Sequence, residues 1–123
     1  MAELGIILCV HGEVVGTDPY KREAAFLTRE LPRLATIPHL RMVLEHMSTA
    51  AAVRALYAHA KRYAEDAQGV AKVAATVTPQ HLLLSREALL AGGLRPHNYC
   101  LPLLQGEYDR RALLWALGTS ASG

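Results

Sequence analysis

The segment Gly5-Ile-Ile-Leu-Cys-Val-His-Gly-Glu13 is a short apolar run that ends in a histidine followed by Gly and Glu. A similar arrangement returns in Leu40-Arg-Met-Val-Leu-Glu-His46, where the histidine lies 35 residues after the first one, and a third apolar run lies within Val70–Val77. Short apolar runs separated by amphipathic stretches predict an α/β fold with a parallel sheet. The sequence therefore predicts three consecutive parallel strand–helix units with right-handed crossovers.

Four helices are expected around these strands, and Gly, Pro and capping residues mark their ends. Pro32 and Pro38 are expected to end the first helix, while Ser48 or Thr49 begins the second. The predicted helices cover residues 17–31, 48–68, 85–91 and 108–117. Residues 95–104, which contain two prolines, are expected to form an irregular segment before the last helix.

The composition is that of a soluble globular protein of at most one domain, with 123 residues, 51% hydrophobic and 20% charged. The net charge is +2 and the basic residues are dispersed among acidic ones, so no nucleic-acid-binding surface is expected. The longest apolar run is too short for a membrane span and no signal peptide is visible, which makes the cytoplasm the expected compartment. Cys9 and Cys100 form no CxxC motif and are expected to be buried apolar residues.

Histidines at the ends of two neighbouring strands are the strongest functional signal in the residues themselves. Functional side chains of parallel α/β folds gather at the carboxyl ends of strands, so His11 and His46 are expected at equivalent positions around a common site. Neutral imidazole is a common zinc ligand, so the two histidines could bind a metal ion together. The alternative is that each histidine is hydrogen-bonded separately at the end of its strand. Two histidines do not complete a catalytic zinc site, which needs at least three protein ligands.

Other polar residues near the expected strand ends have open roles. Glu13 is either a carboxylate that orients an imidazole or a solvated or locally paired charge. Glu45 alternates with the histidine that follows it, so it is expected to point away from the site. The segment Thr76–His81 brings polar groups to the end of the third strand. The segment Arg95–Pro102 either presents backbone N–H and C=O groups to a flat amide-like ligand or is an ordered loop packed on the sheet. His59 is expected on a solvated helix face.

Five blocks of the sequence occur in a recognisable order and spacing: Val10–Glu13, Lys21–Phe26, Val43–His46, Ala75–Leu82 and Gly92–Pro102. This order and spacing resemble those in the sequences of class II dihydroorotases. The last two blocks, Ala-Thr-Val-Thr-Pro-Gln-His-Leu and Gly-Gly-Leu-Arg-Pro-His-Asn-Tyr-Cys-Leu-Pro, are long and specific, and the resemblance extends over nearly the whole chain. Hydantoinases and allantoinases share the superfamily's site but lack these two blocks.

The resemblance implies a partial TIM (β/α)8 barrel of an amidohydrolase that interconverts dihydroorotate and N-carbamoyl-aspartate in pyrimidine biosynthesis. Residues 1–123 would hold barrel strands five to seven within one incomplete domain, and the complete enzyme could form a homodimer. The family has a two-zinc centre bridged by a carboxylated lysine and a hydroxide. His11 and His46 would bind the second zinc (Zn2+), and the backbone of Leu101 would hold the substrate ring. Four residues of the family blocks receive no assigned contact: Thr78, His81, Arg95 and His97.

Parts of the family's site have no counterpart in the sequence. A whole TIM barrel usually takes about 250 residues. The chain has neither the His-x-His of a first strand, nor the bridging lysine, nor the substrate-binding arginine and asparagine, nor the strand-eight aspartate that acts as general base. No catalytic residue is therefore expected within the chain, which is predicted to be an inactive internal segment on its own. The alternatives are a non-catalytic remnant or interaction module, and a related cyclic amidohydrolase of the hydantoinase or allantoinase type.

Overall fold

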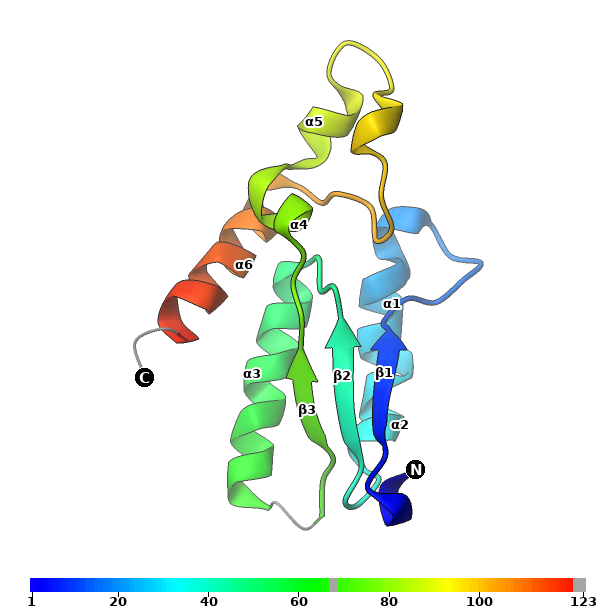
Figure 1. Cartoon of the computed structure of the whole chain (residues 1–123), viewed down its shortest axis with the longest axis vertical. Helices are drawn as coiled ribbons and strands as arrows, with labels where there is room; N and C mark the ends of the chain where they lie inside the picture. Colours follow the sequence, from blue (N-terminus) through cyan, green and yellow to red (C-terminus); the bar gives the residue numbers. More distant parts are fainter. Residues whose placement is uncertain (67–68, 121–123) are drawn as a thin grey trace.

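The computed structural model describes residues 1–66 and 69–120, and its centre is one parallel sheet of three strands. The strands β1 (Ile7–His11), β2 (Arg41–Glu45) and β3 (Lys72–Ala75) lie side by side in chain order (Figure 1). Both neighbouring pairs are parallel, so all three strands end at the same edge of the sheet. The predicted α/β class and the three parallel strands are therefore confirmed.

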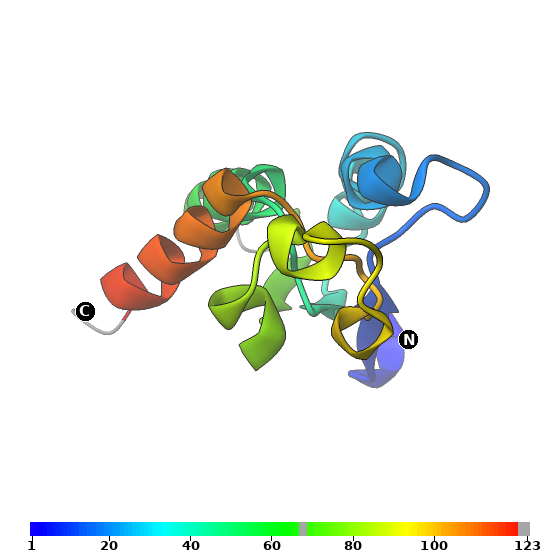
Figure 2. The same cartoon turned by 90° about the horizontal axis from the view of Figure 1, so that it is seen from above.

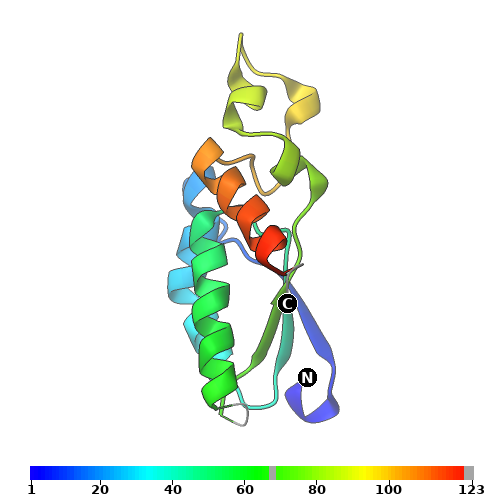
Figure 3. The same cartoon turned by 90° about the vertical axis from the view of Figure 1, so that its left-hand side faces the viewer.

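Helices cover one face of this sheet and extend beyond the carboxyl ends of its strands. Figure 3 shows α1 and α3 on the covered face, with most of the opposite face open, and Figure 2 shows α6 alongside α3. The α-helices are α1 (Arg22–Arg29), α2 (Leu31–Ala35), α3 (Ala50–Glu65), α4 (Pro79–Leu83), α5 (Arg86–Leu90) and α6 (Glu107–Ser120). The 3₁₀ helices are η1 (Ala2–Leu4), η2 (Pro19–Lys21) and η3 (Pro96–Asn98). Among the described residues, no helix is long and apolar enough to cross a membrane.

The covered face of β2 supplies the centre of the hydrophobic core. Met42 and Leu44 are only 2% and 3% exposed, because successive side chains of a strand point to opposite faces and these two point toward the helices. Phe26 of α1, Val53 of α3 and Leu113 of α6 belong to the same buried cluster. Side chains from three helices thus pack against one face of the sheet. Polar residues lie at the carboxyl ends of its strands.

Several helix boundaries differ from the sequence-based expectation. Pro32 does not end the first helix but occupies the first turn of α2, where its missing N–H has no helical acceptor to serve. α6 continues through Gly118 to Ser120, since a glycine inside a helix costs only about 1 kcal/mol relative to alanine. The short helix α4 (Pro79–Leu83) was not expected, although Pro79 stands in its first turn.

The burial expected for three side chains differs from that in the structure. Cys9 is exposed, because it lies on the uncovered face of β1, and Cys100 is only partly buried. His59 does not lie on a solvated face: it is 6% exposed, and its Nε2 lies 2.6 Å from the carbonyl oxygen of Ala71. The ring therefore donates to the start of the β3 segment and joins α3 to the sheet. The basic residues next to His59 in the sequence indicated a solvated face and gave no sign of this tertiary contact.

We expect the 123-residue chain to self-associate in solution at micromolar concentrations. Within the described residues the outer edges of β1 and β3 are unpaired, and Ile7, on the open face, is 45% exposed. Unpaired strand edges and exposed apolar patches favour association. Ala74→Glu, which places a charge on the exposed side of β3, should shift the distribution toward monomer in sedimentation velocity. Monomeric behaviour of the unsubstituted chain across the concentration series, with one cooperative thermal transition, would refute this expectation.

Candidate metal centre

The structure brings His11 and His46 together at the carboxyl edge of the sheet. The Nδ1 atom of His11 lies 2.9 Å from the Nε2 atom of His46. The two rings are arranged edge to face, with centroids 4.5 Å apart and an interplanar angle of 70°. The prediction that these histidines meet at one end of the sheet is confirmed, and the nitrogens that face each other are now defined.

His46 reaches its partner because the strand alternation breaks at its position. Its φ angle is +46°, in the left-handed region that residues other than glycine rarely adopt. The register pairs Glu45 with His11, so these two residues lie on the same face of the sheet. In a regular strand the next ring would point to the helix-covered face. The expectation that Glu45 points away from the site is therefore wrong, because the left-handed turn redirects His46 instead.

Glu13 holds the outer nitrogen of the His11 ring. Its Oε2 atom lies 2.6 Å from Nε2 of His11, and the Glu13 side chain is 4% exposed against 46% for the histidine. A carboxylate accepts hydrogen bonds, so Nε2 carries the proton and Nδ1 of the neutral ring presents a lone pair. This is the arrangement by which carboxylates orient metal-binding histidines. Glu13 is therefore not a solvated charge: it is paired locally with His11, in a position where it also orients the ring.

The two facing nitrogens suit a zinc ion as the group between them. Tetrahedral zinc with nitrogen ligands at about 2.0–2.1 Å sets two of them about 3.3 Å apart, close to the 2.9 Å found here. Burial lowers the pKa of His46, and the neighbouring His11 lowers it further, which favours the neutral, ligating form. The described residues contain no cluster of three or more His, Cys, Asp or Glu side chains arranged for a metal. Within this part of the chain, His11 and His46 are therefore two candidate nitrogen donors and not a complete zinc site.

His81 joins the end of the third strand to the loop that carries Leu101. The His81 ring is 2% exposed; its Nδ1 lies 2.6 Å from the Thr78 hydroxyl, and its Nε2 lies 3.0 Å from the carbonyl oxygen of Pro102. The carbonyl can only accept, so Nε2 donates to it, and Thr78 donates to Nδ1 of the neutral ring. Burial lowers the pKa of His81, which favours this neutral form. These contacts assign structural roles to Thr78 and His81.

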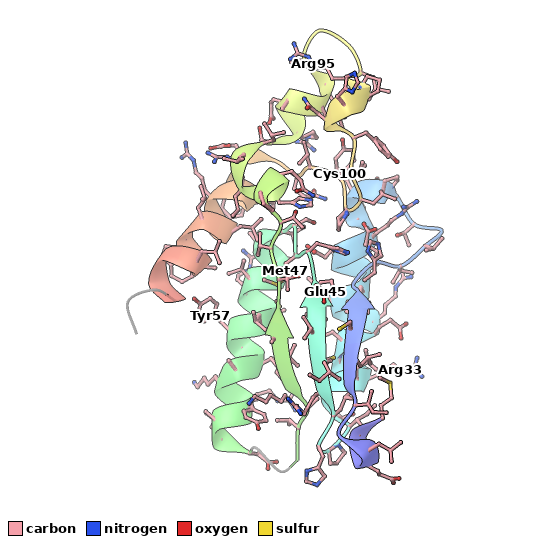
Figure 4. The ribbon with its side chains drawn as sticks, viewed as in Figure 1. Arg33, Glu45, Met47, Tyr57, Arg95 and Cys100 are labelled. Carbon is pink, nitrogen blue, oxygen red and sulfur yellow. The ribbon has the colours of Figure 1, made fainter. Side chains whose placement is uncertain are left out.

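The remaining predicted residues lie at different distances from the histidine pair. The loop that carries Cys100 lies beyond the carboxyl ends of the strands (Figure 4), and Leu101, the next residue, is 49% exposed. Arg95 lies at the end of the molecule beyond the carboxyl ends of the strands, far from the sheet, and donates to the carbonyl of Ala91. His97 is exposed in η3. Arg95 therefore lies away from the histidine pair, and the role of Leu101 stays a prediction.

Glu23 of α1 anchors the segment that follows His46. Its Oε1 accepts a hydrogen bond of 2.9 Å from the backbone N–H of Ser48, and the residue is only 6% exposed. Burial raises the pKa of Glu23, an effect that hydrogen bonds from Thr49 and Ser48 oppose without cancelling. Thr49, the cap of α3, accepts from the N–H of Ala52. Buried contacts from another helix therefore fix the loop that carries His46.

Glu23→Gln should remove a pH-dependent loss of stability. A carboxyl group whose folded pKa is raised stabilises the fold below its unfolded pKa of about 4.3, and this contribution is lost as the pH rises through the raised value. Glutamine keeps an oxygen that can accept from the Ser48 N–H. Urea unfolding between pH 4 and pH 7 should show a smaller decline in stability for the variant. Glu65→Gln, at an exposed position, is the control, and equal declines in the two variants would contradict the prediction.

Thr76 is the residue of this site whose role the sequence pattern did not reveal. It lies directly after β3 and contacts both Glu45 and His46 through its hydroxyl group. The available signal was its place at the third strand end, level with the ends of the other two strands. Such a contact depends on strand register, which the sequence alone does not define.

The sequence comparisons point to one family of enzymes. The chain is 49% identical over 119 residues to the dihydroorotase of Aromatoleum aromaticum, and 50% identical over 127 residues to that of Laribacter hongkongensis. These alignments cover 94% and 99% of the chain, but 32% and 33% of the relatives. The chain therefore spans about a third of the length of the curated relatives it matches. No protein-family profile matches the chain.

Solved structures show the same likeness in three dimensions. The crystal structure of dihydroorotase from Campylobacter jejuni matches 94% of this chain with a TM-score of 0.78 and 27% identity, over 30% of that protein. Dihydroorotase from Saccharomyces cerevisiae, in complex with 5-fluoroorotic acid, matches 97% with a TM-score of 0.77 and 29% identity, over 34% of its chain. These neighbours are TIM barrels, so the three strand–helix units correspond to part of a barrel. Over the third of their length that it matches, the chain belongs to the dihydroorotase family.

Proposed function

We propose that residues 1–123 supply part of the zinc centre of a dihydroorotase, an enzyme that reversibly hydrolyses the cyclic amide of dihydroorotate to N-carbamoyl-aspartate. The observation that carries this proposal is the 2.9 Å approach of Nδ1 of His11 to Nε2 of His46, with Glu13 behind the first ring. Two imidazoles with converging nitrogens and an orienting carboxylate are the parts of a zinc site. The similarity to named dihydroorotases supplies the reaction.

Each residue of the proposed site has a distinct task. His11 and His46 hold one zinc ion of a two-zinc centre, and Glu13 keeps the His11 ring oriented. Zinc, when bound, polarises the amide carbonyl and lowers the pKa of bound water toward 7. The backbone N–H and C=O of Leu101 hold the substrate ring, and His81 supports that loop through the Pro102 carbonyl. The 5-fluoroorotic acid in the yeast relative is a ring of the same kind, which supports a small pyrimidine-type substrate.

We further propose that the chain is catalytically incomplete by itself and forms one barrel domain together with further polypeptide. Two histidines are fewer than the three protein ligands that catalytic zinc sites use. A positioned general base typically contributes about 10²–10⁴-fold in rate, and the proposal assigns this group to a part of the enzyme outside residues 1–123. The complete enzyme is proposed to act in the cytoplasm, as a homodimer, on its small-molecule substrate and without nucleic acid.

A grafted enzyme tests this proposal. In the Laribacter hongkongensis dihydroorotase, the third of the chain that matches this sequence is replaced by residues 1–123. We expect the grafted dihydroorotase to hydrolyse dihydroorotate, followed by its ultraviolet absorbance, and the isolated 123-residue chain to show no turnover above the buffer rate. A folded graft that contains zinc but does not hydrolyse dihydroorotate would refute the proposed function. Turnover by the isolated chain would refute its incompleteness.

A further inference from the structure

Thr76, the first residue after β3, forms hydrogen bonds with the segment that contains His46, at the end of the neighbouring strand β2. Its backbone N–H donates to the carbonyl of Leu44 at 2.9 Å, and its carbonyl accepts from the N–H of Met47 at 2.9 Å. Its hydroxyl oxygen accepts from the N–H of His46 at 2.8 Å, and the hydroxyl donates to Oε2 of Glu45 at 2.6 Å. Backbone bonds thus extend the sheet by one step, while the side chain reaches the histidine itself.

His46, which Thr76 contacts, has an unfavourable backbone conformation. His46 has a φ angle of +46°, and a residue other than glycine keeps such a conformation only where its surroundings stabilise it. This turn brings the His46 ring to the face of the sheet that carries His11, because strand alternation alone would direct it to the helix-covered face. The geometry of the histidine pair therefore depends on whatever stabilises the turn.

The hydroxyl group of Thr76 is oriented for this task. A hydroxyl has one proton and two acceptor lone pairs. The carboxylate of Glu45 takes the proton, which leaves the lone pairs of Thr76 facing the N–H of His46. Glu45 thereby acts on the histidine indirectly, through the direction in which the threonine hydroxyl points. The segment that follows β3 contributes no histidine to the pair, but its Thr76 hydroxyl accepts from the N–H at the turn.

We propose that Thr76 is a positioning residue for the metal-binding ring of His46, and that its hydroxyl, oriented by Glu45, sets the 2.9 Å approach to His11. This inference rests on the proposed zinc centre for its functional meaning. The positioning itself concerns the metal-free chain and is measurable there. Removal of the hydroxyl leaves the backbone ladder intact, so the effect is local to the turn.

The test compares three substitutions in the 123-residue chain. Thr76→Val has nearly the same shape but lacks the hydroxyl, and Thr76→Ser restores it. Thr78→Val is the matched control, because its hydroxyl lies at the same strand end but contacts His81 instead of His46. Zinc affinity is measured by competition with a weak chromophoric chelator, using zinc chloride as the probe. Hydrogen–deuterium exchange of a peptide that covers residues 44–49 reports on the turn without metal.

We expect Thr76→Val to weaken zinc binding about 10–100-fold, the usual effect of removing a group that orients a metal ligand, and to speed exchange within residues 44–49. Thr76→Ser and Thr78→Val should stay within about threefold of the unsubstituted chain. Unchanged exchange and unchanged affinity in Thr76→Val would overturn the inference. If the unsubstituted chain, which holds two of the proposed ligands, binds zinc too weakly to measure, the exchange experiment decides alone: faster exchange in Thr76→Val supports the positioning role, and unchanged exchange overturns it.

Discussion

We expect His11→Ala and His46→Ala each to reduce dihydroorotate hydrolysis by the grafted dihydroorotase at least about 10³-fold, which corresponds to about 4 kcal/mol in the activation barrier. The physical reason is the convergence of the two ring nitrogens on one point, 2.9 Å apart. A site that needs both imidazoles loses its ion, or holds it in the wrong place, when either ring is removed. The measurement is the steady-state rate together with the zinc content of each purified variant.

His39→Asn is the matched control for these substitutions. His39 precedes β2, at the opposite end of the strands from His11 and His46, and its φ angle is +60°, a conformation that asparagine tolerates. This variant should keep the rate of the unsubstituted graft within about twofold, since it removes an imidazole that lies outside the site. A His11→Ala or His46→Ala graft that keeps a rate within tenfold of the parent would show that the histidine pair is not the metal centre.

Met42→Ala is expected to lower the free energy of unfolding of the chain by about 2–5 kcal/mol. Met42 is 2% exposed in the centre of the cluster that joins the sheet to three helices. Because a protein of this size is typically stable by about 5–15 kcal/mol in total, this loss is a large share. Urea unfolding followed by circular dichroism measures it.

The neighbouring residue on β2 provides the control. Val43 lies on the opposite face of the strand and is only partly buried. Val43→Ala should therefore cost about 1 kcal/mol or less. A larger loss for Val43→Ala than for Met42→Ala would mean that the helices cover the other face of the sheet.

The strand ends and the histidine pair were predictable because both depend on local periodicity and chain order. Each apolar run ends where polar residues begin, and parallel strands bring their carboxyl ends to one edge, so His11 and His46 could be placed together. The capping residue Thr49 was also among the expected helix starts. These features follow from residues that lie close to each other in the sequence.

Features that depend on tertiary contacts were not predictable in this way. At the left-handed turn, the N–H of His46 donates to the hydroxyl of Thr76, which follows another strand. His59 is buried because the carbonyl of Ala71 lies next to it, although its sequence neighbours are basic. Cys9 is exposed because the face of the sheet on which it lies is uncovered. In each case the deciding partner lies outside the local pattern.

Anomalous diffraction at the zinc absorption edge, from crystals of the grafted dihydroorotase, shows directly whether zinc lies between His11 and His46. We expect a zinc ion about 2.0–2.1 Å from both Nδ1 of His11 and Nε2 of His46, with Glu13 still bonded to the outer nitrogen of the His11 ring. Crystals of an active, zinc-containing graft in which the ion contacts neither of these nitrogens, and the two rings remain bonded to each other, would contradict it.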